Sequence, residues 1–286
     1  MNHTLRFGLK HSGQRTTIES LRAVWRIADE GGFDHVWDFD HLASIGPAGP
    51  DDPIYEGWTL QAAMAEATKR VRIGCMVTGN TYRHPVLLAK EAVTVDHLSG
   101  GRLEFGIGAA WAEVEHTMYG IEGLDHRVGR LSESLQVIKS LWTDERTNFD
   151  GRYYRLKDAI ANPKPLQKPH PPIWIGASGD ATLRIVARHA DVWNLAGGDV
   201  GRVKELVAKL EATCDEVGRE RTSIRHSIQF PWDGESQNQL IDQSGRLLEL
   251  GFTEQVLMLN PARAAEIAEK MAEALPELRR LQRVLS

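Results

Sequence analysis

The chain has little of what several classes of protein depend on. Its only two cysteines, Cys75 and Cys214, form no CxxC pair, which excludes a disulfide framework and a cysteine-based zinc site. No apolar run is long enough to cross a bilayer, and the first residues lack the apolar core of a signal peptide. We therefore expect a cytoplasmic protein that lies in a reducing compartment and has no membrane partner.

An excess of basic charge is also missing. Lysine and arginine total 34 against 39 aspartates and glutamates, a formal net charge of -5, and the basic residues form no block. Such a chain lacks the electrostatic footprint of a nucleic-acid binder. A composition of 42% hydrophobic and 26% charged residues excludes disordered, collagen-like and coiled-coil proteins. What remains is a protein of ordinary globular composition.

Short runs rich in β-branched and aromatic residues alternate with longer segments of helical period. The runs that predict strands are 5–9, 33–37, 71–77, 103–107, 172–176, 191–195, 223–230 and 253–259. A helical segment follows each run, and the last, 261–281, closes the chain. Eight strand–helix units in 286 residues predict an α/β fold, the (β/α)8 TIM barrel, as a single domain over residues 1–286.

Two loops bear on this fold. A doubly wound open sheet, the other α/β fold considered, places a glycine fingerprint after its first strand, and residues 10–14 (KHSGQ) are no such fingerprint. The long irregular stretch 143–171 separates the fourth predicted helix from the fifth strand and is rich in proline. We interpret it as an insertion between strands four and five that contains a small hairpin over 147–156.

The carboxyl ends of the strands are where such barrels place their active residues. Asp40 and His41 follow the second strand. Glycine-rich turns follow the fourth and fifth strands, at 106–110 and 176–179, and the second of these opens a helix. A lone turn of this kind is ordinary turn chemistry, but two on neighbouring strands favour a phosphorylated ligand.

Two further interpretations of the second strand stay open. Asp38, Asp40 and His41 can be taken for metal ligands, but no other His, Asp or Glu has ligand spacing, so we expect no metal. His41 can also be a hydrogen-bonded helper at a strand end. The residue types alone do not choose between this role and catalysis.

The tryptophans divide by position. Trp37, Trp174 and Trp193 lie on predicted strands, where aromatic side chains usually pack in a core. Trp111 and Trp232 lie beyond the strand ends, where a pocket and simple loop packing are equally open. Motifs of serine hydrolases, P-loop NTPases and HExxH proteases are absent.

Several segments resemble the bacterial luciferase-like superfamily. They are residues 37–41 (WDFDH), 77–85 (VTGNTYRHP), 96–103 (DHLSGGRL), 106–111 (GIGAAW) and 163–173 (PKPLQKPHPPI). The match extends from the first strand to about Asn194, and the sequence looks most like the branch that uses coenzyme F420, a deazaflavin. The resemblance implies an oxidoreductase that transfers a hydride between F420, held at the barrel mouth, and a small organic substrate.

The resemblance also implies the site residues. Asp40 and His41 would lie beside the deazaflavin rings and carry the catalysis, with His41 as proton donor and Asp40 fixing its tautomer or binding the ring. The remaining cofactor residues would be Met76, Val77 and Thr78 in a bulge behind the rings, and Gly108, Ala109, Ala110, Trp111, Ala177, Ser178 and Gly179 around the phosphate. The superfamily typically has a non-proline cis peptide at the end of the third strand, within residues 74–78 here.

The sequence departs from the family pattern at three places. Many relatives carry glycine in place of Ala110, and asparagine or glutamate where this chain has Ala112. The first strand ends in Lys10-His11 without the glutamate of the sugar-phosphate dehydrogenases, which implies another substrate. Alternatives to the F420 enzyme are an FMN-dependent monooxygenase on the same scaffold and a non-catalytic cofactor-binding barrel. Exposed helices of such barrels often pair, so we expect a homodimer.

Overall fold

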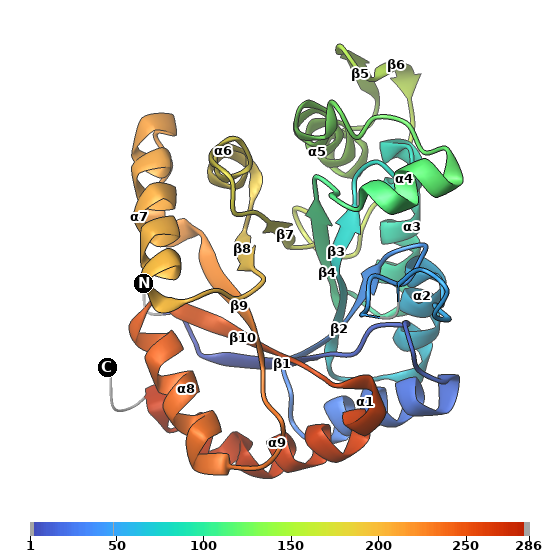
Figure 1. Cartoon of the computed structure of the whole chain (residues 1–286). Helices are drawn as coiled ribbons and strands as arrows, with labels where there is room; N and C mark the ends of the chain where they lie inside the picture. Colours follow the sequence, from blue (N-terminus) through green and yellow to red (C-terminus); the bar gives the residue numbers. More distant parts are fainter. Residues whose placement is uncertain (1–2, 48, 283–286) are drawn as a thin grey trace.

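Eight parallel strands close into a barrel in the computed structural model, which describes residues 3–47 and 49–282 (Figure 1). Their order around the barrel is β1-β10-β9-β8-β7-β4-β3-β2. The strands are β1 (Arg6–Lys10), β2 (His35–Asp40), β3 (Arg72–Gly79), β4 (Leu103–Gly108), β7 (Ile173–Gly176), β8 (Val192–Leu195), β9 (Arg225–Pro231) and β10 (Phe252–Met258). The predicted (β/α)8 barrel is therefore confirmed, with each strand within a few residues of its predicted place.

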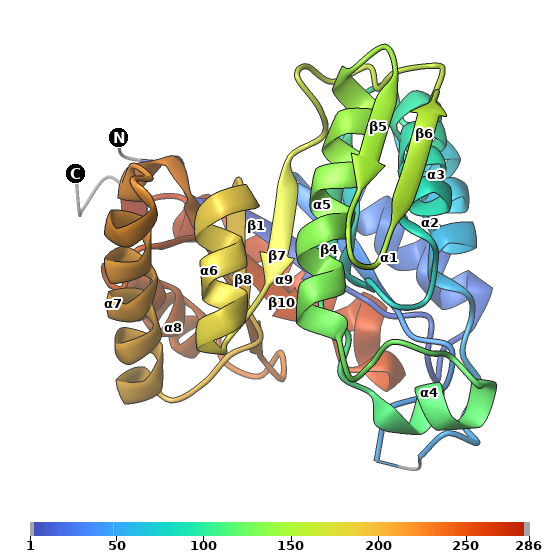
Figure 2. The same ribbon diagram turned by 90° about the horizontal axis from the view of Figure 1, so that it is seen from above.

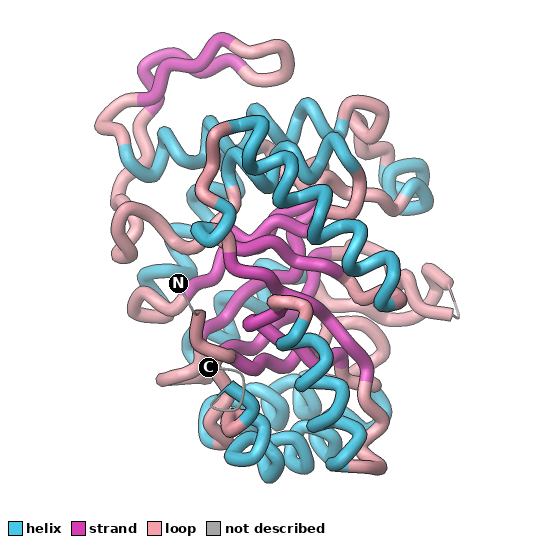
Figure 3. Tube along the Cα trace, turned by 90° about the vertical axis from the view of Figure 1, so that its left-hand side faces the viewer, coloured by secondary structure: helices cyan, strands magenta, loops and turns pink. Residues whose placement is uncertain are grey.

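Helices surround the strands, as the tube view shows (Figure 3). They are α1 (Ile18–Glu30), α2 (Gly57–Ala67), α3 (Pro85–Leu98), α4 (Glu113–Tyr119), α5 (Arg127–Thr143), α6 (Asp180–His189), α7 (Val200–Val217), α8 (Gln237–Glu249) and α9 (Ala264–Leu278), with 3₁₀ turns at Arg221–Ser223 and Pro261–Arg263. None of the helices in the described ranges is long and apolar enough to cross a membrane.

Local sequence explains where these helices begin and end. The Thr17 side chain accepts a hydrogen bond from the Ser20 backbone N–H at 3.2 Å and so caps the start of α1. In α1 the spacing of Leu21, Val24 and Ala28 places all three on the buried face. The last helix was predicted to begin at Pro261, but its first turn is 3₁₀ and the α-helix begins at Ala264.

Three elements lie between β4 and β7 in addition to α5. The short helix α4 was not predicted, because seven residues carry too little periodicity to signal a helix. After α5, the strands β5 (Thr147–Asp150) and β6 (Arg155–Ala159) pair antiparallel. They form the hairpin predicted in this stretch and lie beside α5 on the outside of the barrel (Figure 2).

Apolar side chains pack in two layers. A small cluster fills the inside of the barrel: Trp37, Met76, Trp174, Val192 and Val256. A larger cluster lies between the strands and the surrounding helices and contains Trp193. The three tryptophans expected in the core are fully buried, which confirms that prediction. Because the inner cluster fills the interior of the barrel, a ligand can bind only at the carboxyl ends of the strands.

Candidate active site

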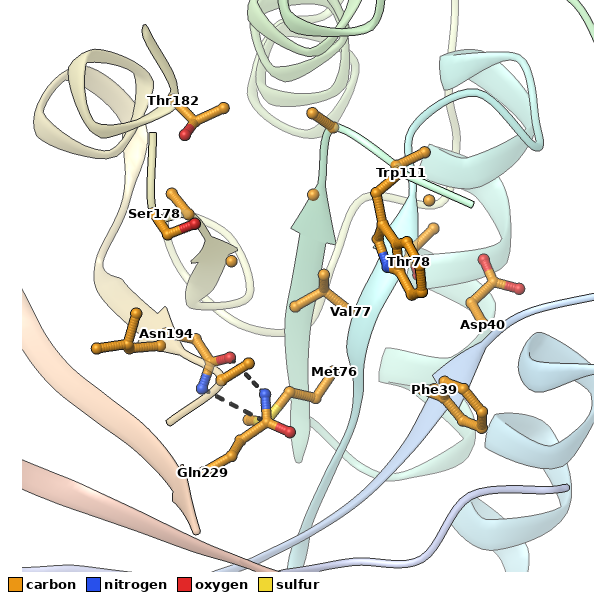
Figure 4. Close-up of a pocket in the computed structure, with 18 of the residues that line it drawn as sticks. Phe39, Asp40, Met76, Val77, Thr78, Trp111, Ser178, Thr182, Asn194 and Gln229 are labelled. Carbon is orange, nitrogen blue, oxygen red and sulfur yellow. Dashed lines mark hydrogen bonds between the residues drawn. The ribbon is translucent and has the colours of Figure 1, made fainter. Parts of the chain in front are cut away.

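One pocket of about 890 Å³ opens at the carboxyl ends of the strands (Figure 4). All residues predicted for the site line it: Asp40, His41, Met76, Val77, Thr78, Gly108, Ala109, Ala110, Trp111, Ala177, Ser178 and Gly179. The structure thus brings four separate segments of the chain to one place, although the roles predicted for them remain predictions. A volume of this size suits a cofactor together with a small substrate.

Asp38 and Asp40 belong to strand β2 itself and not to the loop after it. The ladder with β3 continues through Asp38 and Asp40, so the strand is longer than predicted. The Gln61 amide donates to the Asp38 carboxyl at 2.6 Å, and burial raises the pKa of Asp38 well above its usual value. The Arg83 guanidinium holds Asp40 through both carboxylate oxygens.

His41 has its hydrogen-bond partner in α4. Its Nδ1 donates to Glu115 Oε2 at 2.8 Å, which leaves Nε2 free to face the pocket. Tyr82 also donates to that oxygen, and the backbone N–H groups of Leu42 and Ala43 donate to Oε1 at 2.6 and 3.0 Å. Glu115, not the neighbouring Asp40, therefore sets the tautomer and orientation of His41.

Glu115 stays ionised in this setting. Burial acts to raise its pKa, but the hydrogen bonds from His41 and Tyr82 outweigh it and lower the pKa of Glu115 to about 2. Sequence reasoning missed this residue, which lies 74 positions after His41. The available signal was an acidic residue in the first turn of a helix, directly after a glycine-rich turn.

The two glycine-rich turns lie side by side on β4 and β7. A side chain at Gly108 would place Cβ 2.8 Å from Val77 Cγ2, and one at Gly176 would place it 3.2 Å away. These glycines therefore make room for the Val77 side chain. The later residues of both turns face the pocket, and the second turn leads into the N-terminus of α6.

Ala110 has an unusual backbone conformation in the first turn. Its φ is +67°, in the left-handed region that favours glycine. Ala110 is one of the three positions at which we expected a departure from the family pattern. The peptide bond between Met76 and Val77 is cis, which confirms the cis peptide predicted at the end of the third strand.

Trp111 and Trp232 have separate fates. Trp111 lines the pocket with 63% of its surface exposed, and its ring lies 5.6 Å from that of His41. Trp232 is 9% exposed and packs in the outer core, where its indole N–H donates to the Ser236 carbonyl. The sequence left open whether these two tryptophans line a pocket or pack in loops. Of the two, only Trp111 lines the pocket.

The structure adds residues that were not predicted. Arg127, at the start of α5, and Lys10, Gln229 and Asn194, on β1, β9 and β8, also line the pocket. Within the described ranges there is no group of three or more His, Cys, Asp or Glu side chains able to hold a metal. The absence of a metal remains a prediction for experiment.

Comparison with known proteins gives consistent matches. The family model described as luciferase-like monooxygenase matches residues 3–276. An F420-dependent glucose-6-phosphate dehydrogenase of Microbacterium testaceum is 34% identical over 229 residues, covering 78% of this chain and 67% of that protein. An FMNH2-dependent dimethylsulfone monooxygenase of Pseudomonas putida is 30% identical over 203 residues, covering 70% of this chain and 55% of that enzyme.

Solved structures agree on the fold. An F420-dependent secondary alcohol dehydrogenase, in complex with an F420–acetone adduct, superposes with a TM-score of 0.87 at 18% identity, covering 96% of this chain and 99% of that one. The coenzyme F420-dependent tetrahydromethanopterin reductase of Methanopyrus kandleri gives 0.82 at 16% identity, covering 96% and 100%. At this level of identity the likeness establishes the barrel and no more.

Proposed function

Because the chain belongs to the luciferase-like monooxygenase family, we propose that it is an oxidoreductase transferring a hydride between coenzyme F420 and a small organic substrate. The observation that carries the proposal is the pocket itself, which joins a histidine of defined tautomer to two adjacent glycine-rich turns. F420-dependent enzymes among both the sequence relatives and the solved structures support this choice of cofactor.

The residues present fit a phosphorylated, ring-bearing cofactor. The N-terminus of α6 gives positive potential, and the hydroxyls of Ser178 and Thr182 lie beside it in the pocket (Figure 4). Asp180, the acidic residue in that first turn, is paired with Lys209 at 3.1 Å, a lysine that it shares with Glu205. Arg127 adds a cation to the pocket lining. We therefore propose residues 108–111 and 177–179 as the phosphate site.

The ring system would lie between two groups of residues. Met76, Val77 and Thr78 form one wall, and Asp40 and His41 lie on the neighbouring strand. When bound, the deazaflavin supplies the carbon that gives or accepts the hydride. We propose that the carboxylate of Asp40, held rigid by Arg83, accepts a hydrogen bond from the polar edge of the rings.

His41 is proposed to move the proton that accompanies hydride transfer. Its Nδ1 is occupied by Glu115, so any proton exchanged with the substrate passes through Nε2, the nitrogen that faces the pocket. Because Tyr82 and two backbone N–H groups hold the Glu115 carboxylate, the imidazole keeps one orientation without help from the substrate. The chain thus supplies proton handling and positioning.

Titration of the purified protein with F420 and with FMN tests the cofactor. We expect F420 to bind more tightly and to quench tryptophan fluorescence, with Trp111 as the main reporter because it is the exposed tryptophan lining the pocket. Trp111→Phe should lose most of the quenching, whereas Trp232→Phe, a variant of a buried residue outside the pocket, should keep it. Equal or tighter binding of FMN would instead favour the monooxygenase, an activity carried by the P. putida relative.

The proposal also covers the domain organisation, location, oligomeric state and substrate of the protein. The chain would act as a single domain and as a cytoplasmic homodimer, and a monomeric mass in light scattering at micromolar concentration would contradict the dimer. We propose a substrate other than glucose 6-phosphate, which is in the names of several relatives, because the first strand ends in Lys10-His11 and lacks the glutamate expected for a sugar-phosphate dehydrogenase. Binding of F420 without any turnover would indicate the non-catalytic barrel.

A further inference from the structure

Lys10, Gln229 and Met258 lie across the barrel from the proposed cofactor site. In the closed strand order, β1 faces β7, β10 faces β4 and β9 faces β3. Most of the residues proposed for cofactor binding come from β3, β4 and β7 and the turns after them, with Asp40 and His41 at the end of β2, whereas these three come from β1, β9 and β10. One half of the pocket is therefore left for the substrate.

Lys10 is the charged group of that half. Its Nζ donates to Gln229 Oε1 at 2.8 Å and lies 5.5 Å from the centre of the Phe39 ring. An ammonium has three N–H groups, and no second acceptor for it occurs among the described residues. Nor does any described carboxylate approach it within 4.0 Å, so the cation has no ion-pair partner in the protein.

The amide of Gln229 is oriented by its neighbours. Its Nε2 donates to Asn194 Oδ1 at 2.8 Å (Figure 4). Asn194 Nδ2 in turn donates to Ser227 Oγ at 3.0 Å. The chain of donors runs in one direction, so Oε1 of Gln229 is kept turned toward Lys10. Lys10 is thereby held in place while its two other N–H groups remain available to a ligand.

Lys10 is half-buried in the pocket wall, and this partial loss of water makes the ammonium unfavourable unless an anion joins it. Desolvation lowers the pKa of Lys10 to about 8, so the group is still largely an ammonium at neutral pH. A buried charge without a partner is unfavourable, and a bidentate oxygen anion would satisfy both its charge and its free donors. The Phe39 and Met258 side chains beside it offer apolar contact to the rest of a ligand.

We infer that Lys10, oriented by Gln229, binds a carboxylate of the substrate, which is thus a small organic acid with an apolar body. This inference rests on the proposed function only in naming the ligand of that site as substrate. The binding chemistry depends on Lys10 alone and can be tested without turnover.

Calorimetric titration with benzoate and with its uncharged analogue benzamide tests the inference. The buffer contains no phosphate or carboxylate, so that no other oxygen anion competes for Lys10, and the Lys10 variant separates this site from the glycine-rich turns. We expect benzoate to bind more tightly than benzamide, and Lys10→Met to weaken benzoate by about ten- to a hundredfold while leaving benzamide unchanged. Lys204→Met, which removes an exposed lysine of α7, should change neither.

A second variant covers the case in which Lys10→Met does not fold. Gln229→Glu places a carboxylate beside the ammonium and should abolish the preference for benzoate while the lysine remains. No preference for benzoate in the wild-type protein, or an unchanged preference in both variants, would overturn the inference. If Lys10→Met weakened F420 instead of benzoate, Lys10 would be a cofactor residue and the inference would be wrong, whereas failure of F420 to bind any variant would count against the proposed function only.

Discussion

Glu104 and Glu254 lie fully buried at the amino-terminal end of the barrel, whereas Lys10 and His41 face the pocket at the carboxyl end. Glu254 accepts from Arg6 at 3.1 Å, from His35 at 3.0 Å and from Arg225. Glu104 accepts from the Trp174 indole at 2.7 Å and also contacts Arg6 and Arg72. At this end the buried carboxylates are surrounded by donors from several strands.

At the carboxyl end of the barrel, some hydrogen-bonding groups lack a partner among the described residues. The His41 Nε2 and two N–H groups of Lys10 have no partner among the described residues. Charged groups whose hydrogen bonds are all made within the protein hold strands together, whereas groups with free donors or acceptors can bind a ligand. The contrast separates residues that maintain the barrel from residues that serve its function, and each of the following experiments acts on one end.

The largest effect is expected from His41→Ala at the carboxyl end. Turnover should fall by about 10²–10⁴-fold because the proton donor is lost, while the melting temperature and F420 affinity change little. Steady-state kinetics with thermal unfolding would measure both. Unchanged turnover would contradict the assignment, as would activity that a chelator removes and a divalent metal restores.

Glu254→Gln tests the amino-terminal end. Removing this charge leaves the half-buried Arg225 without its carboxylate and Arg6 with Glu104 alone, so we expect a loss of about 3–5 kcal/mol in the free energy of unfolding. Glu205→Gln, which breaks the exposed pairs of Glu205 with Arg202 and Lys209 on α7, should change the free energy of unfolding little. Denaturant unfolding measures both, and similar losses would show that burial does not distinguish the two sites.

Acid should destabilise the wild-type protein through the same carboxylate. Burial acts to raise the pKa of Glu254, but His35 and the charges of Arg6 and Arg225 lower it to about 2, below the ordinary 4.5 of the unfolded chain. The unfolded state therefore binds more protons, and stability present above pH 4.5 is lost as pH falls toward 2. Unfolding measured between these values should depend less steeply on pH in Glu254→Gln, and an identical dependence would contradict this account.

Ala110→Gly should have the smallest effect and act on the carboxyl end. Glycine adopts the φ of +67° without the clash of a β-carbon, so stability should rise by about 1 kcal/mol and F420 affinity should be kept or improved. Ala109→Gly is the matched control, because Ala109 does not have a positive φ and glycine there only adds freedom to the unfolded chain. A fall in melting temperature for Ala110→Gly would show that the methyl group makes a contact that matters more than its conformation.

The alternation of strands and helices was readable from the sequence because each element buries one face. Residues such as Val36, Ile73 and Ile175 are apolar because their strands are covered by helices, and that pattern is local. The places of Asp40, His41 and both glycine-rich turns followed, since parallel strands bring their carboxyl ends to one edge. Elements too short to show a hydrophobic period, such as α4, could not be predicted in this way.

Contacts between distant segments were decided by the tertiary structure alone. No local pattern links His41 to Glu115 or assigns Asp40 to Arg83, because these pairs depend on the paths of the loops after β2, β3 and β4. The same holds for Lys10. In the sequence it is a charged residue at the end of a strand, and only the fold shows that Gln229 of β9 lies 2.8 Å from its Nζ. Amino-acid order determined which chemical groups reach the barrel mouth, whereas folding determined which of them satisfy one another and which stay free for a ligand, since a hydrogen bond requires a distance that sequence spacing does not contain.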